Sequence, residues 1–402
     1  MMKSNTKRNQ GIALWLAFLF SALFLCTPAL AKVEEGREVW FFGSEYDEYI
    51  YRDALVLSNG NLLLCCGTNR SQYGSKGSDG EFHGWLLCLK PDGSVAWEVH
   101  LEEPGVGSRV NRPIELSDGR IAVYYATSTR QNHLNEGFQY FSLDGESLGY
   151  AESEPGTHLS GLNLFAAEDG YIRTRPDPEL GQPGFFWAEY ITLTGEVLWQ
   201  IPTQQYMHTQ GVLVTEEGFL LFEGGRQVEP ETFGASLYMV SKESGEVLWR
   251  TDLEKQPNFI PRKIIATEDG GFLTVGGTER EGSFEAEGIR VIKWNSRGAQ
   301  EWVQNYTFDE KYVHTVVPVE WKNQYVFVYP AKTNTRLGLL VTDKQGQEEK
   351  RGLLPYKDGD FLNLEPVVFG GQPWLFGDGE QSNGNRDVII MKPDWDALIN
   401  GL

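Results

Sequence analysis

The sequence predicts an all-β fold, a seven-bladed β-propeller built from four-stranded antiparallel blades. Two turn-and-strand patterns recur along the chain at intervals of about 50 residues, and the two chain ends carry complementary parts of one further unit. Four short antiparallel strands in each such unit are typical of propeller blades. Because one register persists through the whole chain, a closed ring is favoured over an array of β-sandwiches.

The first pattern is a tight turn whose glycine is followed four residues later by tryptophan. It occurs in DGSVAWEV (92–99), TGEVLWQI (194–201), SGEVLWRT (244–251) and RGAQEWVQ (297–304). The segments DGESLGYA (144–151) and QGQEEKRG (345–352) keep the turn and lose the tryptophan. We expect this turn to join the third and fourth strands of a blade.

The second pattern is a turn followed by a short apolar strand. It is found in LSNGNLLLCCG (57–67), LSDGRIAVYYA (116–126), TEEGFLLFEGG (215–225) and TEDGGFLTVGG (267–277). Asn-Gly and Asp-Gly between apolar runs are strong hairpin signals, since the turn needs positive φ. The innermost strands of the blades are therefore predicted near 52–57, 111–116, 162–167, 210–215, 262–267, 314–321 and 363–369.

The chain ends predict how the ring closes. The segment DVIIMKPD (387–394) resembles the third strand WLLCLKPD (85–92), but no fourth strand follows it. The segment EGREVWFF (35–42) has the glycine-to-tryptophan spacing of a fourth strand, but no blade precedes it. We therefore expect the N-terminal strand to complete the last blade, which leaves no open edge in the ring.

Residues 1–31 are predicted to be a secretory signal peptide, which leaves 32–402 as a single propeller domain. Lys3, Lys7 and Arg8 precede an apolar run over 12–25, and Ala29-Leu30-Ala31 fits a cleavage site. The product is expected to be periplasmic or secreted, monomeric, and without an integral membrane segment after cleavage. The formal net charge of −21 argues against nucleic acid as a partner.

The repeats resemble those of the quinoprotein-like, or PQQ-like, β-propeller superfamily. The resemblance is carried by TGEVLW (194–199) and SGEVLW (244–249), with weaker matches in the other blades. It implies a propeller over nearly the whole chain after residue 31. Proteins of this superfamily include quinone-dependent dehydrogenases and also non-enzymatic propellers that bind proteins, so the resemblance does not choose an activity.

No motif for catalysis or metal binding is present. The sequence lacks HExxH, CxxC, a haem site, a P-loop, GxGxxG and GxSxG, and its six histidines are scattered. We therefore predict no catalytic residue, no metal and no cofactor.

Polar residues of the innermost strands are expected to converge on the central funnel. The register of the turns selects Arg52, Asp53, Asn111, Arg112, Asn163, His208, Gln210, Arg262, Lys263, His314, Asn363 and Glu365. Four of these are cationic in an acidic protein, and such a funnel would attract an anionic group. Alternatively, pairs such as Arg52 with Asp53 and Arg262 with Glu365 neutralise one another.

These observations favour an exported, non-catalytic binding or scaffold protein whose partner is a protein or a carbohydrate. Two alternatives remain open. One is a PQQ-dependent oxidoreductase, and the other is a lyase or glycosidase that uses funnel residues. A glycosidase needs two carboxylates at a defined separation, and Asp53 and Glu365 are the only two carboxylates among the selected funnel residues.

The aromatic residues and the cysteines are expected to serve packing. Trp40, Trp97, Trp199, Trp249 and Trp302 share one position and should pack between blades. Trp85, Trp187, Trp294, Trp321 and Trp374 break that pattern and are predicted to be free for other roles. Adjacent residues of a strand point to opposite faces, so Cys65 and Cys66 are expected to pack in the core and not to form a ring disulfide with each other. A disulfide between one of them and Cys88 is the alternative that the sequence leaves open.

Overall fold

The structure is a computed structural model. It describes residues 32–34, 37–43, 48–69, 83–101, 107–128, 133–152, 164–176, 186–203, 208–227, 232–253, 259–279, 286–308, 316–331, 336–354, 360–380 and 386–402. The predicted signal peptide lies outside the described residues. No described helix is long and apolar enough to cross a membrane.

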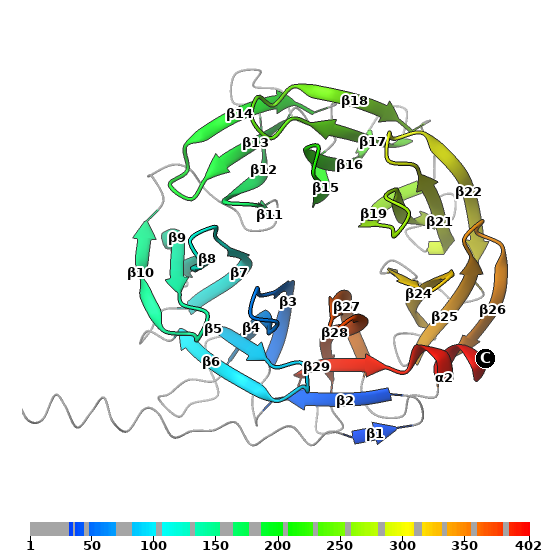
Figure 1. The fold of residues 1–402 in the computed structure, drawn as a ribbon, viewed down its shortest axis with the longest axis horizontal. Coiled ribbons are helices and arrows are strands. Elements are labelled where there is room, and N and C mark those ends of the chain that lie inside the picture. Colours follow the sequence, from blue (N-terminus) through cyan, green and yellow to red (C-terminus); the bar gives the residue numbers. More distant parts are fainter. Residues whose placement is uncertain are drawn as a thin grey trace, which may run out of the picture.

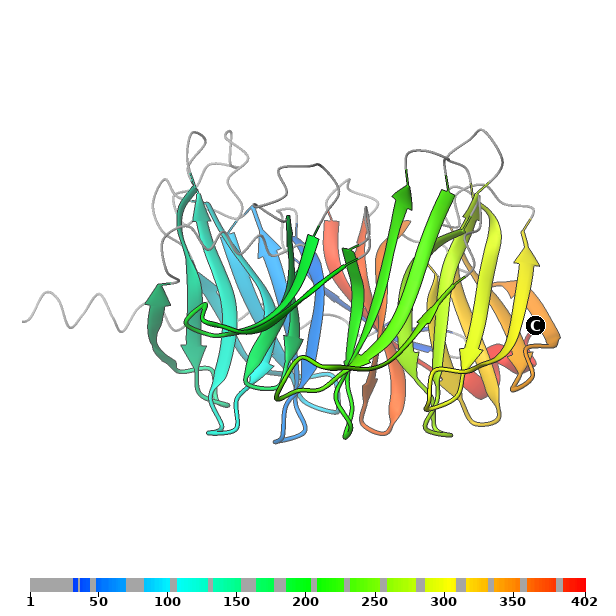
Figure 2. The ribbon, with the colours of Figure 1, turned by 90° about the horizontal axis from the view of Figure 1, so that it is seen from above.

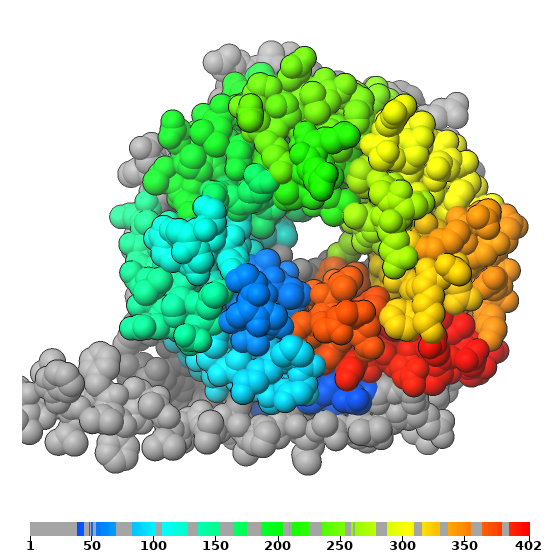
Figure 3. All heavy atoms as spheres, viewed as in Figure 1, coloured from blue at the N-terminus to red at the C-terminus, as the bar shows by residue number. Residues whose placement is uncertain are grey.

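Seven antiparallel sheets stand around a central opening, which confirms the predicted propeller (Figures 1 and 3). Blade 1 contains β3 (Glu48–Val56), β4 (Leu62–Thr68), β5 (His83–Leu89) and β6 (Val95–Leu101). Blade 2 contains β7 (Gly107–Glu115), β8 (Ile121–Ser128), β9 (His133–Phe141) and β10 (Ser147–Glu152). Blade 3 contains β11 (Leu164–Ala167), β12 (Gly170–Pro176), β13 (Phe186–Thr192) and β14 (Val197–Pro202).

The second half of the ring repeats this order. Blade 4 contains β15 (His208–Val214), β16 (Phe219–Gln227), β17 (Thr232–Val240) and β18 (Val247–Asp252). Blade 5 contains β19 (Phe259–Ala266), β20 (Phe272–Glu279), β21 (Ala286–Trp294) and β22 (Gln300–Thr307). Blade 6 contains β23 (Val317–Trp321), β24 (Gln324–Ala331), β25 (Arg336–Asp343) and β26 (Glu348–Leu353). In each blade the first strand lies next to the central opening and the fourth lies at the rim (Figure 1).

Blade 7 joins the two ends of the chain, as predicted. Its strands β27 (Asp360–Phe369), β28 (Gln372–Glu380) and β29 (Arg386–Pro393) come from the C-terminal part. The strand β2 (Arg37–Phe42) pairs with β29 and supplies the fourth position, and β1 (Lys32–Glu34) adds a fifth strand outside it. The ring is thus closed by backbone hydrogen bonds between strands that are far apart in the sequence.

The tryptophans at the repeated position connect neighbouring blades, as predicted. Each ring lies over the turn glycine of the next blade, in the pairs Trp40–Gly93, Trp97–Gly145, Trp199–Gly245, Trp249–Gly298 and Trp302–Gly346. Several of the indole N–H groups also donate to a carbonyl of that turn; for Trp199 the acceptor is Lys242, at 3.0 Å. We call this arrangement the Trp–turn contact.

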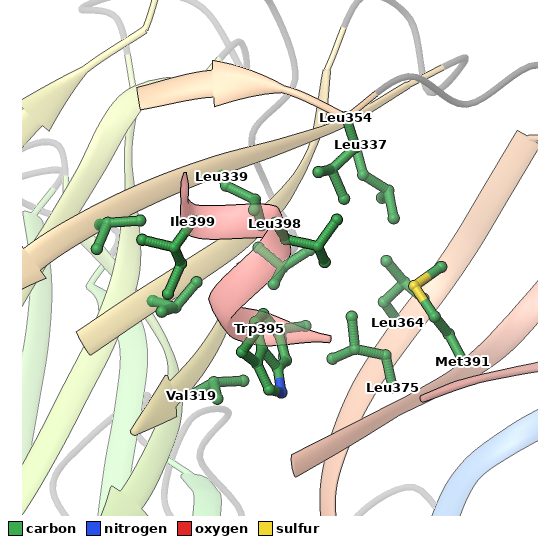
Figure 4. Close-up of a cluster of buried hydrophobic side chains, with 14 of the residues drawn as sticks. Val319, Leu337, Leu339, Leu354, Leu364, Leu375, Met391, Trp395, Leu398 and Ile399 are labelled. Carbon is green, nitrogen blue, oxygen red and sulfur yellow. The ribbon is translucent and has the colours of Figure 1, made fainter. Parts of the chain in front are cut away.

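A short helix, α2 (Trp395–Asn400), follows β29 at the point of the sequence where the other blades have their tight turn. Trp395, Leu398 and Ile399 of α2 are buried in one apolar cluster with residues of blades 6 and 7, as Figure 4 shows. The Trp395 indole donates to the carbonyl of Pro373 at 2.9 Å. The helix therefore belongs to the core of the last two blades.

The expectation that the other tryptophans are free is wrong for several of them. Trp85, Trp294 and Trp374 are buried, and Trp374 stacks on Trp40 with ring centroids 5.2 Å apart. The Trp321 indole donates to Asp396 of α2 at 3.0 Å. These rings fill the space between sheets because large aromatics bury the most apolar area there.

The three cysteines that the structure describes, Cys65, Cys66 and Cys88, are buried, and none of them is joined in a disulfide. Cys65 and Cys88 lie in one apolar cluster, whereas Cys66 lies in the cluster on the other face of the same sheet. The adjacent cysteines thus serve packing, as the alternation of strand side chains predicts. Burial raises the pKa of the Cys66 thiol well above its usual value, and the nearby carboxylates of Glu48 and Asp378 add to that effect.

Candidate functional site

The innermost strands are interrupted by β-bulges beside the central opening. The register with the second strand shifts between Ile50 and Asp53 in β3, Asn111 and Ile114 in β7, Thr209 and Gly211 in β15, Pro261 and Lys263 in β19, and Leu362 and Glu365 in β27. A bulge leaves an extra residue out of the ladder and redirects its side chain, and bulges are enriched next to binding sites.

The bulges fall on the residues that the sequence selected for the funnel. The residues inside the register shifts include Arg52, Arg112, Gln210, Arg262 and Asn363. Asp53, Asn111, Lys263 and Glu365 flank them directly. In β11 and β23 the corresponding position precedes the first described residue, so Asn163 and His314 lie outside the described residues.

Lys263 and Glu365 come together across the ring. Lys263 lies on β19 of blade 5 and Glu365 on β27 of blade 7, and their side chains form an ion pair although blade 6 separates the two blades in the ring. The second carboxylate oxygen of Glu365, Oε1, is buried and has no hydrogen-bond partner among the described residues. The neutralising alternative is therefore realised in part, with Lys263 as a partner of Glu365.

Arg112 is held by blade 3. Its φ of 54° belongs to the left-handed region, which fits its place within a bulge. Its guanidinium lies over the ring of Phe165, 5.0 Å from the centroid, and its carbonyl accepts a hydrogen bond from Tyr171 at 2.7 Å. Arg112 thus connects the innermost strands of two blades.

Of the remaining predicted residues, two have side chains that the structure describes, and five have only a described backbone. Arg262 is exposed on β19, and Asn111 on β7 is buried, with an amide oxygen that lacks a partner among the described residues. The structure places the backbones of five others, but it does not describe their side chains. These are Arg52, Asp53, His208, Gln210 and Asn363.

Sequence analysis missed buried polar groups one or two strands out from the opening. Arg173 on β12 and Glu189 on β13 form a buried ion pair at 2.6 Å. Glu223 on β16 is buried and accepts a hydrogen bond from the Tyr238 hydroxyl. A charge inside an otherwise apolar second strand, as in FLLFEGG (219–225), was the available signal. Such groups are paired because an unpaired buried charge is costly.

The described residues do not fit a calcium and quinone site. No three His, Cys, Asp or Glu side chains among them gather as metal ligands. The five tryptophans of the repeat are used in Trp–turn contacts, so they do not offer a platform for a cofactor. We therefore derive no step through these groups.

The fold is similar to solved propellers with low sequence identity. The β-propeller domain of the trilobed protease from Pyrococcus furiosus, which has an open velcro topology, matches with a TM-score of 0.50 and 10% identity, over 87% of this chain and 98% of that one. A structure from a study of two prolyl endopeptidases matches with a TM-score of 0.50 and 14% identity, over 87% of this chain and 50% of that one.

An acylaminoacyl peptidase from Pyrococcus horikoshii aligns with a TM-score of 0.48 and 11% identity, over 89% of this chain and 56% of that one. This chain thus spans about half the length of the acylaminoacyl peptidase and prolyl endopeptidase chains. No family model matches the sequence, and no curated protein matches it. At these identities the likeness shows the fold alone.

Proposed function

We propose that the protein is an exported, non-catalytic β-propeller of the PQQ-like repeat type that binds an anionic group of a protein or carbohydrate partner at its central opening. It acts as a monomer in the periplasm or outside the cell, and nucleic acid is not its partner. The observation that carries the proposal is the set of β-bulges, which fall on the cationic and polar residues of several innermost strands.

The charges support an anionic ligand. Arg262 is exposed, and Lys263 beside it keeps about a quarter of its side chain exposed while it pairs with Glu365. Cations in a concave site attract anions, because the surrounding low-dielectric walls concentrate the field. Guanidinium groups also bind carboxylates and sulfates with two parallel hydrogen bonds. The fold itself places no restriction on the ligand, since propellers serve many functions.

The test is titration calorimetry of the full chain with a uronic-acid oligosaccharide and with inorganic sulfate. Arg262→Ala should weaken binding about 10-fold, because a charge-assisted contact to the anion is lost. Arg297→Ala removes a charge from an exposed turn at the rim and is the matched control. Unchanged binding by Arg262→Ala would overturn the proposal.

A second variant tests the role of the ion pair. Glu365→Gln removes the carboxylate that neutralises Lys263, so the affinity for the same oligosaccharide should rise several-fold. The variant keeps the size of the side chain, and its amide still accepts a hydrogen bond from Lys263. If affinity falls instead, Glu365 contributes to the ligand contact and Lys263 is not available to an anion.

A further inference from the structure

Three consecutive blades expose large apolar side chains on their outermost strands. Leu148 on β10, Leu198 on β14 and Leu248 on β18 are 49%, 50% and 48% exposed. Each is accompanied on its strand by a second exposed apolar residue, namely Tyr150, Val197 and Val247. Neighbouring apolar residues exposed on one sector of a surface are a common mark of an interaction site.

The repeat does not require these side chains. Each leucine is the third residue after the turn glycine, and the same position holds Glu301 in blade 5 and Glu349 in blade 6, both exposed. The Trp–turn contact between blades 5 and 6 forms with Glu301 beside its tryptophan. An exposed leucine at this position therefore occurs in blades 2 to 4, whereas blade 1 has the half-buried Ala96, and packing between blades does not explain the exposed leucines.

In blade 7 the chain itself covers the equivalent position. Val39 is the third residue after Gly36, and it is only 1% exposed. It belongs to the apolar cluster that contains α2, and its strand β2 is paired on the outside by β1. Among the described residues, β10, β14 and β18 each pair with one strand only. Their outer edges thus offer the type of site to which β1 adds in blade 7.

The charge pattern indicates what could add to these edges. In blade 7 the register places Glu34 of β1 opposite Arg37, the first residue after the turn glycine. The same position in blades 2 to 4 holds the exposed residues Glu146, Glu196 and Glu246. Opposite charges across a strand pair stabilise it and like charges destabilise it, so exposed glutamates at this position disfavour an acidic residue on an added strand. A basic residue is the matching choice.

We propose that the outer edge of each of β10, β14 and β18 is a docking site for an extended segment of a partner protein that alternates apolar and basic side chains. The segment adds antiparallel to an edge strand, as β1 adds to β2, and main-chain hydrogen bonds provide much of the affinity. Its apolar side chains cover Leu198 and its equivalents, and its basic side chains face Glu196 and its equivalents. This site lies at the rim (Figure 1) and is independent of the proposed anion site.

The test uses the full chain and a short synthetic peptide that alternates lysine and valine, with a glutamate and valine peptide as the reference ligand. The basic peptide should bind and the acidic one should not, by fluorescence anisotropy. Leu198→Ser with Leu248→Ser should weaken binding about 10-fold or more, because the apolar area that the peptide would cover is lost. Both leucines are half exposed, so the variant should fold, and Glu349→Gln on blade 6 is the control.

Hydrogen exchange identifies where the peptide binds. Added peptide should slow exchange in β10, β14 or β18, since main-chain groups at those edges become paired. Protection confined to the innermost strands, or equal binding by the leucine variant, would overturn the proposal. If the protein forms dimers that the leucine variant abolishes, and the basic peptide does not compete, the occupant is a second copy and the proposal is wrong.

Discussion

The interfaces between blades fall into two groups, and the difference shows how a ring of unequal repeats stays closed. Five interfaces have the Trp–turn contact, whereas those between blades 2 and 3 and between blades 6 and 7 lack the tryptophan. In blade 2 the position holds Gly149, and in blade 6 it holds Lys350. Each exception is stabilised in its own way.

Between blades 2 and 3 the specific contacts lie closer to the axis. Phe138 stacks on Tyr171 with ring centroids 5.1 Å apart, and the Tyr171 hydroxyl donates to the carbonyl of Arg112. Between blades 6 and 7, Lys350 donates to the carbonyl of Ile399 at 2.8 Å, and α2 takes the place of the turn. An ammonium thus replaces the indole N–H as donor, and a helix replaces the turn as acceptor.

The largest expected effects come from the aromatic rings that dominate each group. Trp199→Ala should lower the free energy of unfolding by about 3–5 kcal/mol, since a buried ring and its hydrogen bond are lost. Trp395→Ala in α2 should cost a similar amount, because the helix closes its interface as a Trp–turn contact does. Urea unfolding of both variants measures this. A cost below about 1 kcal/mol for Trp395→Ala would mean that α2 only covers the surface.

A glycine pair separates the strain of the turn from the tryptophan contact. Gly245 has a φ of 72°, and a Cβ added there would lie 2.7 Å from Trp199. Gly60 has a φ of 83°, but nothing lies within 4 Å of such an atom. Gly60→Ala should therefore cost about 1 kcal/mol from strain alone, and Gly245→Ala about 2–3 kcal/mol. If thermal unfolding shows that the two variants lose equal stability, the contact with Trp199 does not restrict position 245 to glycine.

The interface without a Trp–turn contact between blades 2 and 3 should respond to a single hydroxyl. Tyr171→Phe removes the hydrogen bond to the Arg112 carbonyl and keeps the ring that stacks on Phe138. The expected loss is about 1 kcal/mol in urea unfolding, the usual net value of one hydrogen bond. If the free energy of unfolding does not change, that interface is stabilised by its apolar contacts alone.

Blade 7 should add a pH dependence through Asp387. Burial raises the pKa of this carboxyl to about 6 from its usual value near 3.8. The folded state therefore holds the proton more tightly than the unfolded state, and stability should decline as the pH rises from about 4 to about 6. Asp387→Asn should remove that decline, a difference of about 1 kcal/mol after screening by water. Unfolding curves of both proteins across this pH range should converge at pH 4 and separate above pH 6.

The repeat was predictable from the sequence because its signals are local. A turn glycine at positive φ and a tryptophan at fixed spacing, as in Gly245 and Trp249, leave a pattern that can be counted. The positions of the innermost strands followed from the same register, whereas the bulges within them were not predicted. The helix over 395–400 was missed because a fourth strand was expected at that point of the repeat. Its apolar side chains pack against residues of blades 6 and 7, which are far away in the sequence.

The sequence by itself determined the number of blades, the closure by β2 and the positions of the Trp–turn contacts, since each depends on spacing along the chain. Only the tertiary structure decided which residues meet across the ring. The pair of Lys263 with Glu365 skips a whole blade, and no local pattern encodes such a distance. The exposure of Leu198 and the burial of Val39 were likewise decided by what packs outside each strand. Spacing determines a repeat, whereas contacts between repeats depend on their arrangement in space.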